Sequence, residues 1–225
     1  KQAELIPSIS SEDWQKKKFY FPKNTINVAT LFSGIGAVEH ALKRLRLKSN
    51  VVFAGDIDPH VKDAYFANYN INQKDWHDDV TQFSAKKYRG SVDLLVGGSP
   101  CQSFSMAGRR GGMDDARGTL FYDFIRVVQE SNPKIFIFEN VRGVINHDGG
   151  NTWRVMKDIF NSLSNYSWTF KILNSADYGM PQSRNRLFVV GIRKVVKGLR
   201  NVNKPFLFPQ SISLNKTMQD FLEDH

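Results

Sequence analysis

The sequence alternates between short apolar runs and longer segments with helical periodicity, and this alternation limits the possible folds more than any other feature. Continuous apolar and β-branched runs predict buried parallel strands at 26–32, 51–58, 92–98 and 134–141. Segments with helical spacing follow at 37–45, 59–69, 118–131 and 151–163, and two more strands are expected at 167–175 and 186–193. The pattern predicts an α/β fold with an open, mostly parallel sheet and helices on both faces.

The composition indicates a protein of a reducing compartment with an anionic partner. The chain has 225 residues, a net charge of +9 and one cysteine. The charge favours a partner such as nucleic acid, although a basic surface alone would also account for it. One cysteine excludes an internal disulfide, and the sequence contains neither an apolar run that could span a bilayer nor a signal-peptide pattern. These observations predict a cytoplasmic setting.

Polar residues of unusual kinds stand at the ends of the predicted parallel strands. Because ligands of open α/β sheets bind at the carboxyl ends of the strands, these residues mark the expected site. They are Ser33 and Gly34, Asp56, the run from Gly98 to Cys101, and Glu139 with Asn140.

A glycine-containing turn after the first strand indicates a cofactor site. Gly36 lies in this turn, and Asp56 follows about twenty residues later, where an acid can take ribose hydroxyls. The run GIGAVE lacks the third glycine of the dinucleotide fingerprint, so the pattern predicts some ribose-bearing cofactor rather than NAD. A tight turn with a solvated acid is the alternative. Asp58 is either a second such acid or the cap of the next helix.

Cys101 directly follows a predicted strand, and Pro100 restricts the backbone before it. A lone cysteine is commonly a small buried hydrophobe, but this one lies at the sheet edge where ligands bind. The segment 102–118 after it contains four glycines and three arginines. Such a segment predicts a lid over a polyanion or, alternatively, a mobile surface loop.

Three further charged residues are candidates for the same edge. Glu139 follows four apolar residues, so it is a candidate site acid, a helix cap or one half of a buried ion pair. Arg184 and Arg186 occupy alternate positions entering a strand and would point to one face. That face would bind an anion, or would be a solvated basic edge.

Together these motifs resemble the DNA (cytosine-5)-methyltransferase family. The matching runs are LFSGIGAVEHAL, GGSPCQSFSMAG, RGTLFYDFIRVV, FENVRG and LNSADYGMPQSRNRLFVVGIR. They occur in the family's order and spacing and cover roughly residues 26–193. The resemblance implies a Rossmann-like S-adenosylmethionine-dependent methyltransferase fold and methyl transfer to carbon 5 of a flipped-out cytosine in duplex DNA, typically within a restriction-modification system.

The resemblance also implies roles for individual residues. Cys101 would add to carbon 6 of cytosine, Glu139 would contact N3 and the exocyclic amine, and Arg184 would orient the base with support from Arg186. The residues implied in cofactor binding are Phe32, Ser33, Gly34, Gly36, Asp56, Ile57, Asp79, Pro100 and Leu120. The residues implied in DNA binding are Gln102, Ser105, Arg109 and Arg110, and no metal ion is expected.

The sequence departs from the family pattern at one cofactor position. The family often has an acid, an aromatic residue and an acid after the second strand, whereas this chain has Asp56, Ile57 and Asp58. Adenine packing would therefore depend on the smaller surface of Ile57. We expect this difference to weaken stacking without abolishing cofactor binding.

The resemblance divides the chain into a leader (1–25), a catalytic domain (26–193) and the start of a connection (194–225) toward a target-recognition region that this chain lacks. A truncated chain and one subunit of a split enzyme both remain open. The expected location is the bacterial cytoplasm or nucleoid. Alternative functions are a tRNA cytosine-5 methyltransferase, a subunit inactive without its partner, and a NAD-dependent dehydrogenase, although the incomplete glycine fingerprint disfavours the last.

Overall fold

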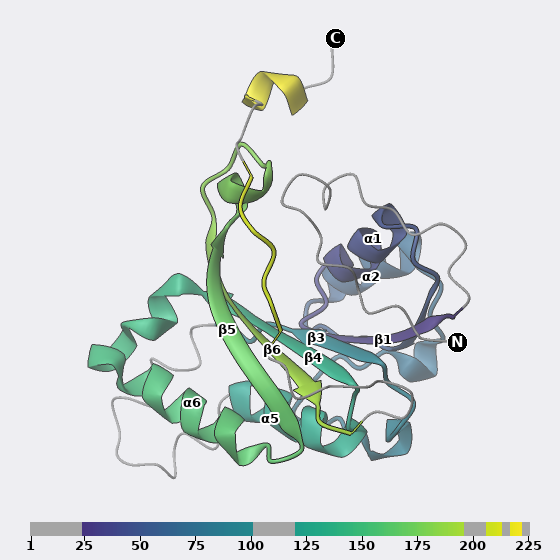
Figure 1. The fold of residues 1–225 in the computed structure, drawn as a ribbon. Coiled ribbons are helices and arrows are strands. Elements are labelled where there is room, and N and C mark those ends of the chain that lie inside the picture. Colours follow the sequence, from purple (N-terminus) through teal and green to yellow (C-terminus); the bar gives the residue numbers. More distant parts are fainter. Residues whose placement is uncertain (1–23, 101–119, 196–205, 213–216, 222–225) are drawn as a thin grey trace, which may run out of the picture.

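A six-stranded sheet forms the centre of the computed structural model, which describes residues 24–100, 120–195, 206–212 and 217–221 (Figure 1). The order of the strands is β2-β1-β3-β4-β6-β5. They span Ile26–Leu31 (β1), Ser49–Phe53 (β2), Leu94–Gly97 (β3), Ile135–Val141 (β4), Tyr166–Asn174 (β5) and Asn185–Arg193 (β6). The predicted strands are confirmed to within a few residues, except that β2 ends at Phe53, which leaves Asp56 in the loop that follows.

The α-helices also follow the sequence pattern closely. They are α1 (Ala37–Arg44), α2 (Pro59–Asn68), α5 (Leu120–Ser131) and α6 (Asn151–Ser162). Short 3₁₀ helices occupy the loops: η1 (Gln73–Asp75), η2 (Lys86–Tyr88), η4 (Arg142–Ile145), η5 (His147–Gly150), η6 (Ser175–Tyr178) and η7 (Met218–Phe221). In the described part of the chain, no helix combines the length and apolarity that crossing a membrane requires.

The direction of the strands determines which residues can reach the site. β2, β1, β3 and β4 are parallel, whereas β6 is antiparallel to both β4 and β5. β5 therefore runs in the same direction as the parallel strands, and only β6 is reversed. As a result, the start of β6 and the end of β5 lie at the same edge as the carboxyl ends of the parallel strands.

Helices cover both faces of the sheet, as the fold class predicted. The alternating side chains of β1 show the division: Ala29 and Leu31 belong to the main core cluster with α5 and α6. Thr30, on the opposite face, bonds to Glu39 of α1. Helices α1 and α2 thus share one face, and α5 and α6 share the other (Figure 1).

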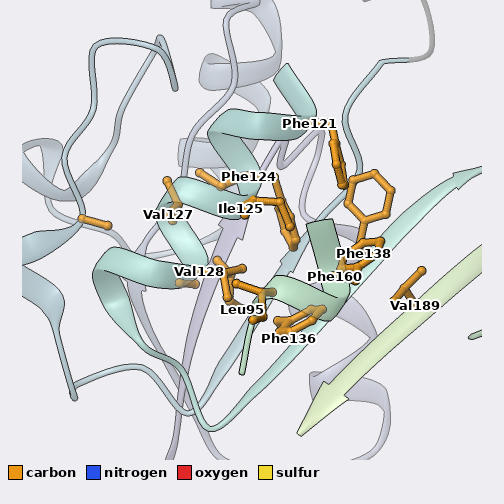
Figure 2. Packing of buried hydrophobic residues seen from close by; sticks show 14 of the residues in the cluster. Leu95, Phe121, Phe124, Ile125, Val127, Val128, Phe136, Phe138, Phe160 and Val189 are labelled. Atoms are coloured by element: carbon orange, nitrogen blue, oxygen red, sulfur yellow. The ribbon is translucent and has the colours of Figure 1, made fainter. Parts of the chain in front are cut away.

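Aromatic rings fill the core between the sheet and α5 and α6 (Figure 2). Phe136 and Phe138 of β4 both contact Phe160 of α6, with ring centroids 6.0 Å apart in each pair. Gly191 of β6 leaves room for the ring of Phe136, because a Cβ at position 191 would lie 2.1 Å from that ring. Truncating such a buried ring costs about 3–5 kcal/mol, so this core fixes β4 firmly.

Residues 206–212 lie beside the loop that joins β5 to β6 (Figure 1). The hydroxyl of Tyr178 donates to the carbonyl of Pro209 at 3.0 Å, and the N–H of Ile212 donates to the carbonyl of Asp177 at 2.8 Å. These two contacts attach the segment to η6.

Candidate active site

The turn after β1 has a backbone that only a few residue types adopt easily. Gly34 and Gly36 have φ values of 54° and 87°, and Phe32 has a φ of 54°. A non-glycine residue such as Phe32 in this left-handed backbone conformation costs on the order of 1–2 kcal/mol, and such strain concentrates at functional sites. At Gly36 a Cβ would lie 2.1 Å from the ring of Tyr69, so no larger residue fits there.

Ser33 attaches this turn to the end of β2. Its backbone N–H donates to the carbonyl of Gly55 at 3.0 Å, and its hydroxyl accepts from the N–H of Gly55 at 2.9 Å. Gly55 in turn packs against the next loop, because a Cβ there would lie 2.1 Å from the carbonyl oxygen of His77. Three loops at the carboxyl edge of the sheet are thus held together through one glycine.

Asp56 is oriented by backbone groups. Its Oδ2 accepts from the N–H of Gly34 at 3.0 Å, and its Oδ1 accepts from the N–H of Asp58 at 3.2 Å. Asp58 caps α2 by accepting from the N–H of His60 at 2.8 Å. Of the two interpretations of Asp58, the helix cap is therefore the one observed, and Asp56 remains the acid beside the glycine turn.

Two exposed aliphatic side chains flank these groups. Ile35 is 67% exposed and Ile57 is 76% exposed. The Asp56 carboxylate is held by backbone N–H groups and lies next to apolar side chains and a glycine turn. This combination suits a nucleoside, because the carboxylate can accept from ribose hydroxyls and the apolar side chains can pack on a base. The residues therefore fit the adenosine part of S-adenosylmethionine.

The remaining predicted cofactor residues lie around this turn in the fold. Asp79 follows the loop of His77, and its Oδ1 accepts from both the N–H and the hydroxyl of Thr81 at 2.8 Å. This leaves its Oδ2 without a partner among the described residues. Leu120 is the first residue of α5 and is half-buried. Pro100 is exposed after β3. No contact tests their roles, which stay predictions.

The segment that leads to the cysteine is held by the neighbouring strand. The buried side chain of Asn140 on β4 donates from Nδ2 to the carbonyl of Ser99 at 3.1 Å, and its Oδ1 accepts from the N–H of Val141 at 2.8 Å. Gly98 lies against the same strand, since a Cβ there would be 2.8 Å from both the carbonyl oxygen and Oε2 of Glu139. Cys101 itself lies outside the described residues, as do Gln102, Ser105, Arg109 and Arg110.

Glu139 pairs with Arg186 across the β4–β6 ladder. Arg186 Nε lies 3.0 Å from Glu139 Oε1, and the two side chains are 21% and 34% exposed. Arg186 is opposite Val141 and Glu139 is opposite Phe188, so the pair is diagonal on one face. Glu139 lies among the last three residues of β4, close to the end of the strand as the sequence predicted.

Arg184 stands at the entrance to β6, as the sequence predicted, but it makes no contact with Glu139 among the described residues. It precedes β6 and is exposed, and its guanidinium has no ion pair or hydrogen bond within the part of the chain that the structure covers. Its backbone is held instead: the N–H of Arg184 donates to Asn174 Oδ1 at 2.9 Å, and its carbonyl accepts from the N–H of Ser175 at 3.2 Å. The structure thus brings Arg186, and not Arg184, to Glu139.

The sequence marked Gly98 and Asn140 only as residues of the expected edge and gave Asn174 no place in the site, although all three shape this edge. All three lie inside the motifs that carried the family resemblance, and that position was the available signal. Their contacts are to backbone atoms of other segments, which residue spacing does not reveal.

The sheet order, the glycine turn with its preset acid, and the acid–arginine pair define a Rossmann-like S-adenosylmethionine-dependent methyltransferase fold. Two solved structures support the fold. The chain superposes on a DNMT2 variant of Spodoptera frugiperda with a TM-score of 0.65 at 23% identity, covering 89% of this chain and 60% of that one. It superposes on the methyltransferase EhMeth of Entamoeba histolytica with a TM-score of 0.65 at 17% identity, covering 90% and 61%.

A family model described as C-5 cytosine-specific DNA methylase matches residues 26–225, and the chain belongs to this family. It is 40% identical over 198 residues to the orphan methyltransferase M.SPRI of Bacillus phage SPR, covering 88% of this chain and 44% of the relative. It is 36% identical over 192 residues to the type II methyltransferase M.HhaI of Haemophilus parahaemolyticus, covering 85% and 55%. The chain thus spans about half the length of these relatives.

Proposed function

We propose that this chain is the cofactor-binding and catalytic part of a DNA cytosine-5 methyltransferase. The observation that carries the proposal is the convergence of Glu139, paired with Arg186, and the Ser99 carbonyl, held by Asn140, on one edge of the sheet. Family membership supplies the reaction class. The names of the relatives include both orphan and type II enzymes, which supports a role in restriction-modification or in phage DNA modification.

The chemistry assigns one task to each group. The Cys101 thiolate adds to carbon 6 of a flipped-out cytosine while Glu139 gives a proton to N3, and this makes carbon 5 nucleophilic. Arg186 holds the Glu139 carboxyl and offsets negative charge in the pocket, and Arg184 orients the base. When bound, S-adenosylmethionine supplies the methyl group. A base such as water then takes the proton from carbon 5, the thiolate is expelled, and the N3 proton returns to Glu139, which restores both Cys101 and Glu139.

The cofactor would lie against the turn after β1. Asp56 would accept the ribose hydroxyls, Ile57 would pack on the adenine, and Asp79 would take its exocyclic amine through Oδ2. Phe32, Ser33, Gly34, Gly36, Pro100 and Leu120 would line the remainder. Gln102, Ser105, Arg109 and Arg110 would contact duplex DNA. Target recognition and full activity would require the remainder of the protein or a second subunit, acting where the DNA is, in the bacterial cytoplasm.

A covalent trap tests the proposal. The protein, alone and together with the rest of the enzyme or its partner subunit, is incubated with S-adenosylmethionine and duplex DNA containing 5-fluorocytosine. We expect an adduct that survives denaturation, and we expect Cys101→Ser to abolish it. Glu139→Gln and Arg186→Gln should slow it strongly, whereas Arg154→Gln, which removes an exposed arginine of α6, should not. An adduct formed equally by Cys101→Ser would refute the assignment, and an adduct only with tRNA would identify an RNA enzyme.

A further inference from the structure

A buried carboxylate lies behind the glycine turn. Glu39, in the first turn of α1, is only 4% exposed. Its Oε1 accepts from the hydroxyl of Tyr65 at 2.7 Å and from the hydroxyl of Thr30 at 3.1 Å. Its Oε2 is also buried and has no hydrogen-bond partner within the described ranges. Burial of a carboxylate is costly unless the group is paired and fully hydrogen-bonded, and Oε2 of Glu39 meets neither condition among the described residues.

Structural needs alone do not explain the charge. No lysine, arginine or histidine forms an ion pair with Glu39 in the part of the chain that the structure describes, and a neutral acceptor would satisfy Tyr65 and Thr30 equally well. The start of α1 supplies partial positive charge, which lowers the cost of the carboxylate. Burial, together with the charge of Glu39, raises the pKa of Tyr65 well above its usual value, so the tyrosine remains a proton donor at Glu39.

Hydrogen bonds connect this carboxylate to the turn. The hydroxyls of Thr30 and Ser33 are 2.8 Å apart, and Ser33 Oγ accepts from the N–H of Gly55. Each hydroxyl has a single hydrogen. When Thr30 donates to Glu39, Ser33 can donate its hydrogen either to Thr30 or to the carbonyl of Gly55, which lies 3.0 Å away. In the first arrangement the chain of donors runs from the turn inward to the carboxylate, and in the second Ser33 is bonded to the loop after β2.

We propose that Glu39 is a specificity-determining residue of the cofactor site, whose buried negative charge favours the cationic sulfonium of S-adenosylmethionine over the neutral thioether of S-adenosylhomocysteine. The inference depends on the proposed function, because it requires this cofactor at the turn after β1. Methyl transfer removes the positive charge, so the same carboxylate helps the product to leave. A charge shielded from water acts over a longer distance than an exposed one, so Glu39 can act without touching the ligand.

Isothermal titration calorimetry with both ligands separates the charge from the hydrogen bonds. On the wild-type protein we expect tighter binding of S-adenosylmethionine than of S-adenosylhomocysteine. Glu39→Gln should weaken S-adenosylmethionine binding on the order of five- to tenfold and change S-adenosylhomocysteine binding less than about twofold. Tyr65→Phe, which keeps the charge and removes one donor, should change both affinities by the same factor.

A second variant covers the case in which Glu39→Gln does not fold. The triple variant Thr30→Val, Glu39→Leu and Tyr65→Phe replaces the network by apolar groups of similar shape, and the hydroxyl of Ser33 keeps an acceptor at the carbonyl of Gly55. It should lose the same preference between the two ligands. If the variants without the charge lost affinity equally for both ligands, the inference about Glu39 would be overturned while the proposed function would stand. Failure of the wild-type protein, in its complete form, to bind either ligand would overturn the proposed function and the inference with it.

Discussion

The side chain of Asn140 holds the carbonyl of Ser99, two residues before Cys101, at 3.1 Å. The side chain is 2% exposed and also accepts from the N–H of Val141. One buried carboxamide thus links the strand that carries Glu139 to the segment that carries the cysteine. This link holds the end of the described segment, up to residue 100, against β4.

Asn140→Asp is expected to slow formation of the 5-fluorocytosine adduct. The carboxylate can still accept from Val141, but it cannot donate to Ser99 and places negative charge against a carbonyl oxygen. Asn140→Ala, which leaves both backbone groups unsatisfied, should also lower the free energy of unfolding by about 1–3 kcal/mol for each buried group. Adduct kinetics and urea unfolding measure the two effects. An adduct rate for Asn140→Asp equal to that of the exposed control Asn50→Ala would contradict the role.

Gly98→Ala should displace Glu139. The added methyl would lie 2.8 Å from the carbonyl oxygen and from Oε2 of Glu139, which is closer than real Cβ contacts allow. We expect adduct formation to fall roughly ten- to hundredfold, because small displacements of catalytic groups have large effects on rate. Gly143→Ala is the matched control, since a Cβ there meets nothing within 4 Å. Equal rates for the two variants would show that this packing is unimportant.

Ile57→Phe should tighten cofactor binding. The side chain is 76% exposed beside Asp56, and an aromatic ring offers a larger surface for stacking on adenine. We expect a gain of roughly two- to tenfold in affinity for S-adenosylmethionine and a loss for Ile57→Ala. Calorimetric titration measures both, with Val195→Phe as an exposed control. An unchanged affinity in both Ile57 variants would exclude this residue from the adenine site.

Acidification should destabilise the fold through His77. Its ring stacks on Phe83 with centroids 3.8 Å apart, and its pKa is lowered from 6.5, first by burial and then by the charge of Lys87. His77 therefore binds a proton more readily in the unfolded chain than in the folded chain. This contribution to stability is complete above pH 6.5 and is lost as the pH falls from there through the lowered pKa of the folded state.

The measurement for His77 is the free energy of urea unfolding between pH 7.5 and pH 5. His77→Phe keeps the stacking on Phe83 and removes the titrating group, so its stability should fall less steeply with acid than that of the wild type. His60→Phe, at an exposed position of α2, serves as the control. Parallel pH profiles for the wild type and His77→Phe would exclude His77 as the titrating group.

The sequence was sufficient for most of the fold, because the strand and helix periodicities of this chain are strong. It also placed Gly34, Gly36 and Asp56 beside one another, since their spacing follows the geometry of a strand–turn–helix unit. It could not identify which arginine pairs with Glu139. That choice depends on the register of β6 against β4, because the two arginines are two residues apart and a shift of two residues would bring Arg184 to the place of Arg186 on the same face.

Glu39 shows a second limit of the sequence. A charged residue in the first turn of an amphipathic helix normally indicates a solvent-facing position. Its burial depends on Tyr65 from α2 and Thr30 from β1, which come together only in the folded chain. Side chains that are buried by several distant segments are those that periodicity assigns least reliably.

The attachment of residues 206–212 to η6 has a mechanical consequence. Asp177 and Tyr178 receive this segment, and they belong to the same loop whose far end carries Arg184. A displacement of Pro209 or Ile212 would therefore pull on the short loop that ends at Arg184. Because β5 runs with the parallel strands and β6 alone is reversed, this loop lies at the same edge of the sheet as Asp56 and Ser99, and a movement of residues 206–212 would reach that edge before any other part of the sheet.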